Sequence, residues 1–235
     1  MARLHPIPPF DELTYFPTAR WIRATRGDNT IVDTRHAVLV WEPGKTVPSY
    51  ALPRQDAAPA AAAEARGFDD PDLDGYVSVS WGAAEHWYEE DEEVFVHPRD
   101  PFVRVDAIKS SRHVRVERDG RLLAESGEPV LVFETGLPTR YYLPERDVDA
   151  SLLSDSDLQT GCPYKGLASY NDVTIDGQEH RGLFWYYPAP LHEVSQIKGH
   201  RAPYGERVDL FVDGQLQERP AGPLGRRGQE LKRAA

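Results

Sequence analysis

Hydrophobic and polar residues alternate in short runs along most of the chain, a pattern that is typical of β-strands. Residues 114–118, Val-Arg-Val-Glu-Arg, alternate with a period of two and lead into Asp119-Gly120, a strong signal for a two-residue hairpin turn. Asp213-Gly214 predicts another hairpin near the end of the chain. The strands that this pattern predicts are short and joined by tight turns.

Helix-period patterns are scarce by comparison. The continuous apolar runs at 38–41 and 130–133 predict strands that are buried on both faces. The alanine-rich run at 57–65 contains helix formers, but it has no apolar stripe and a proline interrupts it. We interpret this run, together with the acidic stretch at 69–74, as a flexible insert outside the core. The sequence therefore predicts a mainly β fold with little helix.

The chain contains an internal repeat. Residues 22–42 return at 114–134 with an offset of 92 positions (114 − 22). One residue is then lost, and residues 50–56 match residues 141–147. A repeat of this length indicates a duplicated domain rather than a solenoid.

The duplication sets the expected domain organisation. Farther along the chain, we match residues 87–88 with residues 185–186, because both pairs read Trp-Tyr. We expect a first, degenerate copy at 14–105, a second copy at 106–219 that carries the reactive residues, and a disordered tail at 220–235.

Composition excludes several classes of protein. The formal net charge of −11 argues against a nucleic-acid-binding protein, which needs a basic face. Cys162 is the single cysteine, so an internal disulfide or a four-cysteine zinc site cannot form. The histidines lack ligand spacing, and we expect no metal and no cofactor. No apolar run approaches the ~18 residues of a membrane span, and no signal-peptide pattern is present, so we expect a cytoplasmic protein.

The densest group of reactive residues lies at 161–170 in the second copy. A turn made by Pro163 and Gly166 would bring Cys162 close to Lys165, whose ammonium could then stabilise the thiolate. The alternative is that Cys162 is a small buried hydrophobic residue and Lys165 a solvated or paired charge.

A second group of candidate residues precedes this segment. Arg140 and Tyr142 suit a carboxylate or phosphate ligand, because the guanidinium fork can hold two oxygen atoms at once. The first copy carries serine and alanine in their places. The alternative for Arg140 is a surface ion pair with Glu145 or Asp147.

Residues 197–204 form the third group. Lys198 and His200 flank a glycine and can point to the same side of an extended strand, and His200 could act as a general acid or base near neutral pH. The alternative for His200 is a satisfied residue of the core or its rim. We match this segment with the acidic run at 89–93, which we interpret as a solvated face.

The order of these motifs resembles domain-of-unknown-function family 427 over about residues 14–219. The resemblance rests on residues 134–144, 162–170, 185–190 and 197–200, and on residues 97–101 and 110–113 as the segment between two copies. It implies a small, strongly bent antiparallel sheet of the β-tent type in each copy. The family label implies nucleotidyl transfer, but the chain lacks a Gly-Ser followed by paired aspartates.

The resemblance also implies limits. Some relatives with this architecture bind zinc through Cys-x-x-Cys pairs, which this chain lacks, so a zinc site is not carried over. The family usually has a tryptophan where Asn171 stands and an apolar pair where Arg201 and Pro203 stand. These departures predict an altered pocket.

Together these observations favour a pocket for a small, anionic molecule in the second copy. Cys162 would be the nucleophile or thiol acid, Lys165 would stabilise its thiolate and His200 would move the proton. The candidate ligand-binding residues are Glu134, Arg140, Tyr142, Tyr164, Tyr170, Trp185 and Lys198. A non-catalytic sensor or carrier, and a structural or partner-binding protein, stay open as alternatives, as does the question of an enzyme. A homo-oligomer is compatible with the sequence but not indicated by it.

Overall fold

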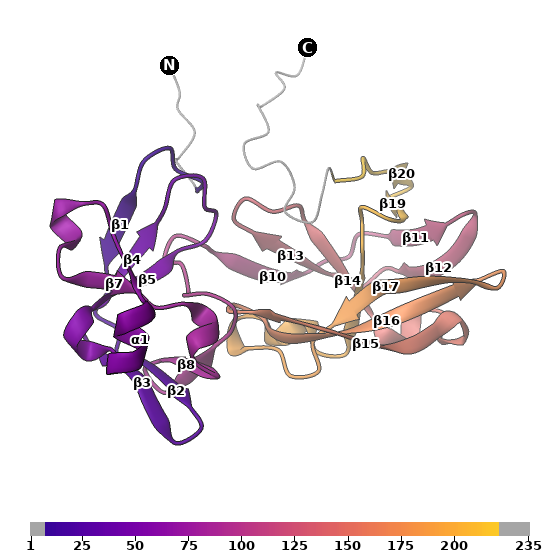
Figure 1. The fold of residues 1–235 in the computed structure, drawn as a ribbon. Helices are drawn as coiled ribbons and strands as arrows, with labels where there is room; N and C mark the ends of the chain where they lie inside the picture. The colour runs from indigo at the N-terminus through magenta and orange to yellow at the C-terminus, as the bar shows by residue number, and fades with distance from the viewer. Residues whose placement is uncertain (1–7, 221–235) are drawn as a thin grey trace, which may run out of the picture. The chain divides into compact units, whose positions relative to one another are not determined.

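The computed structural model of this chain describes residues 8–220. They form four antiparallel sheets with few short helices, which confirms the expected mainly β fold. The chain divides into two compact units between Phe102 and Val103 (Figure 1). Residues 221–235, most of the expected disordered tail, lie outside the described range.

The first unit contains two sheets that enclose one main core. The larger sheet runs in the order β1 (Thr14–Pro17), β4 (Val38–Trp41), β5 (Ser49–Pro53), β7 (Tyr76–Ser78), β6 (Arg66–Gly67). The smaller sheet runs in the order β3 (Asn29–Thr34), β2 (Ile22–Arg26), β8 (His86–Glu89), β9 (Glu92–Val94). The short helices are η1 (Arg54–Asp56), α1 (Pro59–Glu64), η2 (Pro71–Leu73) and η3 (Trp81–Ala83).

The second unit repeats this plan and extends it. Its larger sheet runs in the order β10 (Val105–Lys109), β13 (Val130–Glu134), β14 (Arg140–Pro144), β18 (His200–Pro203), β17 (Gln178–Tyr186), β16 (Gly166–Ile175), β15 (Leu153–Cys162). The smaller sheet runs in the order β12 (Arg121–Ser126), β11 (Val114–Arg118), β19 (Asp209–Val212), β20 (Gln215–Leu216). The short helices are η4 (Glu145–Asp147), η5 (Ala150–Leu152) and η6 (His192–Ile197).

The strand register corrects one expected match between the copies. Ala24 in β2 pairs with Trp87 in β8, and the equivalent Val116 in β11 pairs with Leu210 in β19. Trp87 therefore corresponds to Leu210, and its expected match to Trp185 is wrong. The Trp-Tyr dipeptide occurs in both copies but at positions that are not equivalent, because strand pairing and not local sequence decides which positions are equivalent.

Both predicted hairpin turns are present. Asp119 and Gly120 have φ angles of 53° and 78°, and Asp213 and Gly214 have 52° and 79°. Positive φ at both central positions is the type I′ geometry whose twist matches that of the flanking strands. These two turns align β11 with β12 and β19 with β20.

The alanine-rich run of the first unit is ordered, in contrast to the flexible insert that we expected. Pro59 stands in the first turn of α1, where a missing N–H costs nothing and the fixed φ favours a helix. Ala62 is buried in the main core, and its carbonyl oxygen accepts a hydrogen bond from Arg54 Nη1 at 2.7 Å. The proline therefore begins the helix instead of breaking it.

The acidic run at 89–93 is not a uniformly solvated face, because Glu89 is buried. Its Oε1 accepts hydrogen bonds from the Tyr50 hydroxyl at 2.7 Å and from the Arg99 backbone N–H at 3.1 Å. Arg20 Nη1 lies 3.1 Å from Glu89 Oε2. Burial, followed by the charge of Glu89, raises the pKa of Tyr50 well above its usual range, so Tyr50 stays a donor.

We expect Tyr50→Phe to destabilise the protein by about 1–3 kcal/mol, because a buried carboxylate loses its hydroxyl donor. Urea denaturation measures this change. Tyr88→Phe, at a half-buried position of β8, is the matched control and should change stability by less than about 0.5 kcal/mol. Equal effects of the two substitutions would contradict the role given to Tyr50.

A buried histidine links the two sheets of the second unit. His180 in β17 accepts a hydrogen bond at Nδ1 from Arg118 Nε of β11, at 3.1 Å. Burial, and then the positive charge of Arg118, lowers the pKa of His180 below its usual value. The folded protein therefore binds this proton less tightly than the unfolded chain does.

The lowered pKa predicts a loss of stability on acidification. The contribution of His180 is complete above the unfolded pKa of about 6.5 and is lost as the pH falls below that value. His180→Asn keeps an acceptor for Arg118 and does not titrate. Between pH 7.5 and pH 5.5, the melting temperature of the native protein should fall by more than that of this variant. Parallel curves would refute the assignment.

Candidate functional site

The turn that the sequence predicts between Cys162 and Lys165 is present. Cys162 ends β15 and Gly166 begins β16, and the Lys165 N–H donates to the Cys162 carbonyl oxygen at 3.4 Å. Gly166 has a φ of 97°, and a Cβ there would lie 3.2 Å from the Ala189 carbonyl oxygen. Both constraints favour glycine, so Gly166 helps to hold the turn in place.

Lys165 and Glu134 form a largely buried ion pair. Lys165 Nζ donates to Glu134 Oε2, and the two side chains are 11% and 12% exposed. Burial alone would lower the pKa of Lys165, but its electrostatic interactions with Cys162, Glu134 and Tyr142 and its hydrogen bond to Glu134 outweigh burial and raise the pKa well above its usual value. Lys165 is therefore a fixed positive charge at neutral pH and not a neutral amine nucleophile.

Aromatic residues pack beside this pair on one face of the larger sheet. Tyr142 is buried, and its oxygen accepts a hydrogen bond from Trp185 Nε1 at 2.8 Å. Burial raises the pKa of Tyr142 well above its usual range. The Tyr170 hydroxyl lies 2.7 Å from Thr160 Oγ1. Tyr142, Trp185 and Tyr170 belong to the same buried cluster, against which Cys162 also packs.

Two tyrosines of this cluster, Tyr187 and Tyr204, were not among the candidate residues predicted from the sequence. Tyr187 is buried, and burial raises its pKa. Tyr204 lies with its ring centroid 4.8 Å from that of Trp185, and burial raises its pKa to about 12. Tyr187 could have been found from the sequence, because it stands two positions after Trp185 and strand side chains alternate between faces. Tyr204 contacts the cluster only through the tertiary fold.

Arg140 is already paired within the unit. Its Nη1 and Nη2 donate to the two carboxylate oxygens of Glu206 at 2.9 and 2.7 Å, a bidentate geometry. The guanidinium also lies 5.5 Å from the centre of the Trp185 ring. Arg140 does form an ion pair, as the alternative reading of the sequence expected, but its partner is Glu206 and not Glu145 or Asp147. Glu145 pairs with Arg201 instead.

The remaining candidates are His200, Lys198 and Tyr164. His200 is in β18, where its Nδ1 is 3.0 Å from the Lys198 carbonyl oxygen and its backbone pairs with Pro144. Lys198 is exposed at the end of η6. Within residues 8–220, no described contact joins His200 or Lys198 to Cys162. Tyr164 is half-buried inside the turn itself.

The departures from the family pattern contact one another. Arg201 Nε donates to Asn171 Oδ1 at 2.9 Å, and Asn171 Nδ2 donates to Asp155 Oδ1 at 3.2 Å. Asn171 pairs with Phe184, whereas Tyr170 belongs to the aromatic cluster on the other face of the sheet. This polar group therefore lies behind the aromatic wall.

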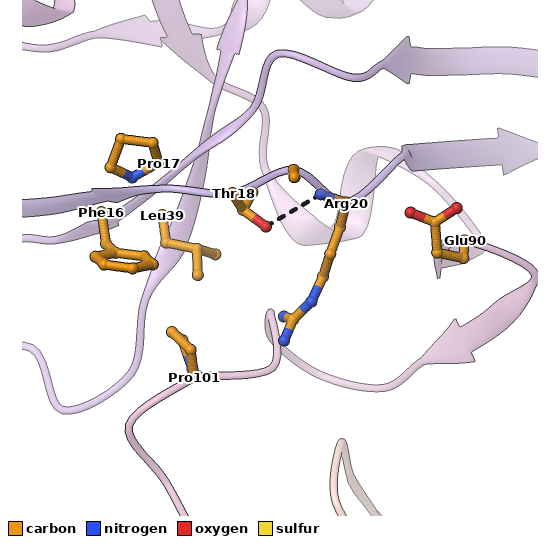
Figure 2. A pocket seen from close by; sticks show the side chains of 8 residues that line it. Phe16, Pro17, Thr18, Arg20, Leu39, Glu90 and Pro101 are labelled. Atoms are coloured by element: carbon orange, nitrogen blue, oxygen red, sulfur yellow. Dashed lines mark hydrogen bonds between the residues drawn. The ribbon is translucent and has the colours of Figure 1, made fainter.

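The first unit contains a shallow hollow of about 370 Å³ that the sequence did not suggest (Figure 2). Its walls are Phe16, Pro17, Thr18, Ala19, Arg20, Leu39, Glu90 and Pro101. Arg20 Nη1 donates to the Arg99 carbonyl oxygen at 2.9 Å and also pairs with Glu89. The charge of Arg20 is therefore already neutralised, and the hollow is mainly apolar.

In the part of the chain that the structure describes, no group of three or more His, Cys, Asp or Glu side chains is arranged to hold a metal ion. The same residues include no helix with the length and apolar character that a membrane crossing requires.

Comparison with known proteins assigns the second unit to a family. Residues 106–214 match the family described as Domain of unknown function (DUF427), which confirms the resemblance for this unit. The second unit therefore contains a DUF427 domain. The family match does not include the first unit, which resembles the second unit in strand order and register. No curated protein matches the chain.

The buried ion pair generates a stability prediction. Lys165→Met leaves the Glu134 carboxylate buried without its partner, so we expect a loss of about 3–5 kcal/mol. Adding Glu134→Gln to this variant removes both charges and should restore part of the loss. Chemical denaturation of the three proteins measures the effect. If Glu134→Gln destabilised the Lys165→Met variant by as much as it destabilises the native protein, the two side chains would not be coupled and the pairing would be contradicted.

Proposed function

We propose that the second unit binds a small molecule beside the Cys162–Lys165 turn and that Cys162 reacts with it. The observation that carries this proposal is the buried Lys165–Glu134 ion pair next to Cys162 and the aromatic cluster. Apolar residues of similar size would often stabilise a fold as well as a buried ion pair does. Buried charges beside a potential nucleophile therefore favour a functional explanation.

The chemistry of the turn supports a nucleophilic role for Cys162. A fixed ammonium beside a thiol stabilises the thiolate, which is the reactive form. Lys165 provides such a charge, since its raised pKa keeps it protonated, and Glu134 holds the ammonium in position. Cys162 is partly exposed, so a small reagent can reach it.

The pairing of the cations narrows the class of ligand. Arg140 is neutralised by Glu206 and Lys165 by Glu134. A strongly anionic ligand would have to displace one of these carboxylates, which weighs against the anionic molecule favoured by the sequence. The aromatic side chains instead favour a small, flat molecule with an electrophilic atom that Cys162 can reach.

One observation favours the alternative of a binding module without catalysis. His200, the expected proton carrier, makes its described contact with the Lys198 carbonyl oxygen and none with Cys162 among residues 8–220. If His200 moves no proton, a bound molecule could be held without being converted. In this alternative, ligand-induced thermal stabilisation survives Cys162→Ser, because binding raises stability whatever the chemistry.

The proposal predicts opposite effects of two substitutions on the rate at which iodoacetamide alkylates Cys162 at pH 7. Lys165→Met removes the stabilising charge and should slow alkylation. Glu134→Gln frees the ammonium from its carboxylate and should accelerate it. Circular dichroism establishes that each variant is folded. Equal rates in all three proteins, or a thiol that reacts only on unfolding, would place Cys162 in a structural role.

A further inference from the structure

Tyr187 stands where the backbone reaches the turn between β15 and β16. It directly follows β17, and the segment that begins with it runs to Leu191, whose N–H donates to the Lys165 carbonyl oxygen at 3.1 Å. A Cβ on Gly166 would lie 3.2 Å from the carbonyl oxygen of Ala189 in the same segment. The segment that begins with Tyr187 therefore packs against the turn that carries the candidate nucleophile.

Tyr187 and Cys162 lie on the same face of the larger sheet. Tyr187 belongs to the buried aromatic cluster, and Cys162 packs against that cluster. Cys162 pairs with Gly166 of β16, and Tyr186, the residue before Tyr187, pairs with Ser169 of the same strand. The backbones of Cys162 and Tyr187 are therefore two strands apart, which is roughly 10 Å across the sheet. A small molecule bound between them can contact both side chains.

The Tyr187 hydroxyl differs from those of the other buried tyrosines in the cluster. The Tyr142 oxygen accepts a hydrogen bond from Trp185 Nε1, and the Tyr170 hydroxyl lies beside Thr160 Oγ1. In the part of the chain that the structure describes, no group forms a hydrogen bond with the Tyr187 hydroxyl. This hydroxyl is therefore available to a bound molecule.

The Tyr187 side chain is buried except near its tip. The residue is only 5% exposed, so packing holds its ring in place. Within the described residues, the fully buried side-chain nitrogen and oxygen atoms without a hydrogen-bond partner are Arg23 Nε and Glu89 Oε2. The Tyr187 oxygen is not among them, so it keeps contact with solvent. A ligand can thus reach this hydroxyl, while the packed ring fixes its position.

The Tyr187 hydroxyl is a donor at neutral pH. Burial, followed by the electrostatic effects of Tyr142 and Cys162, raises the pKa of Tyr187 well above its usual range, so the hydroxyl keeps its proton. Since such effects act between neighbouring groups, the hydroxyl lies near the thiol. A fixed donor beside a nucleophile can stabilise the negative charge that develops on a carbonyl oxygen during attack.

We propose that the molecule attacked by Cys162 is a small aromatic aldehyde and that the Tyr187 hydroxyl binds its carbonyl oxygen. This inference rests on the nucleophilic role proposed for Cys162. The thiolate forms a C–S bond to the carbonyl carbon, and the π electron pair moves to the oxygen. Tyr187 donates a hydrogen bond to that oxygen, which then takes up the proton that the thiol released. The product is a hemithioacetal, so nothing is oxidised or reduced and no group leaves.

Carbon NMR of benzaldehyde, isotopically labelled at its carbonyl carbon, tests the proposal. This carbon loses its carbonyl chemical shift when the hemithioacetal forms, and titration gives the dissociation constant of the adduct. Cys162→Ser should form no adduct and so identifies the thiol. Methylation of Cys162 by iodomethane, followed by mass spectrometry, reports on the thiolate alone, because iodomethane has no oxygen atom for Tyr187 to bind.

Tyr187→Phe removes the hydroxyl and keeps the ring. We expect this variant to bind benzaldehyde about tenfold more weakly, because a hydrogen bond to a developing oxyanion is lost. Its methylation rate and its unfolding midpoint in urea should equal those of the native protein. Tyr186→Phe is the matched control, because Tyr186 points to the opposite face of the sheet, where Arg201 lies over its ring. It should change none of the three measurements.

The outcomes separate a failure of this inference from a failure of the proposed function. If Cys162 is methylated normally but forms no adduct, or if Tyr187→Phe binds benzaldehyde as tightly as the native protein, the aldehyde inference is overturned and the nucleophile stands. A parallel loss of both reactions in Tyr187→Phe would also overturn the inference, because Tyr187 would then act on the thiolate. If Cys162 in the folded protein reacts with neither reagent, both proposals are wrong.

Discussion

The Lys165–Glu134 ion pair connects the part of the second unit that the first lacks with the part that both share. Glu134 ends β13, a strand of the repeated scaffold, and Lys165 lies in the turn of the added β15–β16 hairpin. The first unit keeps the carboxylate as Glu42, which pairs with Arg66 of β6 in a more exposed setting. The added hairpin buries the pair, and burial strengthens its effect on every titratable group nearby.

The asymmetry between the units follows from this added hairpin. Strand order and register are shared, so both units present equivalent positions at the same places on their sheets. In the second unit, β15 and β16 extend the larger sheet and supply Tyr170 and Cys162 to the aromatic cluster (Figure 1). In the first unit, α1 occupies the corresponding part of the chain and the core closes over Ala62. The duplicated scaffold thus carries the buried Lys165–Glu134 pair in the second unit, whereas the equivalent Glu42 of the first unit forms a more exposed ion pair.

Part of the candidate site could be predicted from sequence because its geometry is local. Pro163 and Gly166 indicate the turn that brings Cys162 and Lys165 together within four residues. The partners of the charged groups could not be predicted in this way. Arg140 pairs with Glu206, which is 66 positions away in the sequence. An acidic chain contains many carboxylates that could pair with each cation, and strand pairing decides which of them lies beside it.

The sequence by itself determined the mainly β class, the two hairpin turns and the duplication, because alternation and turn chemistry act over a few neighbouring residues. Only the tertiary structure decided that Trp87 corresponds to Leu210, that Glu89 is buried and that His200 contacts the Lys198 carbonyl oxygen. These features depend on which strands become neighbours and in which register. A shift of one residue in that register reverses the face of every side chain, and local sequence does not record it.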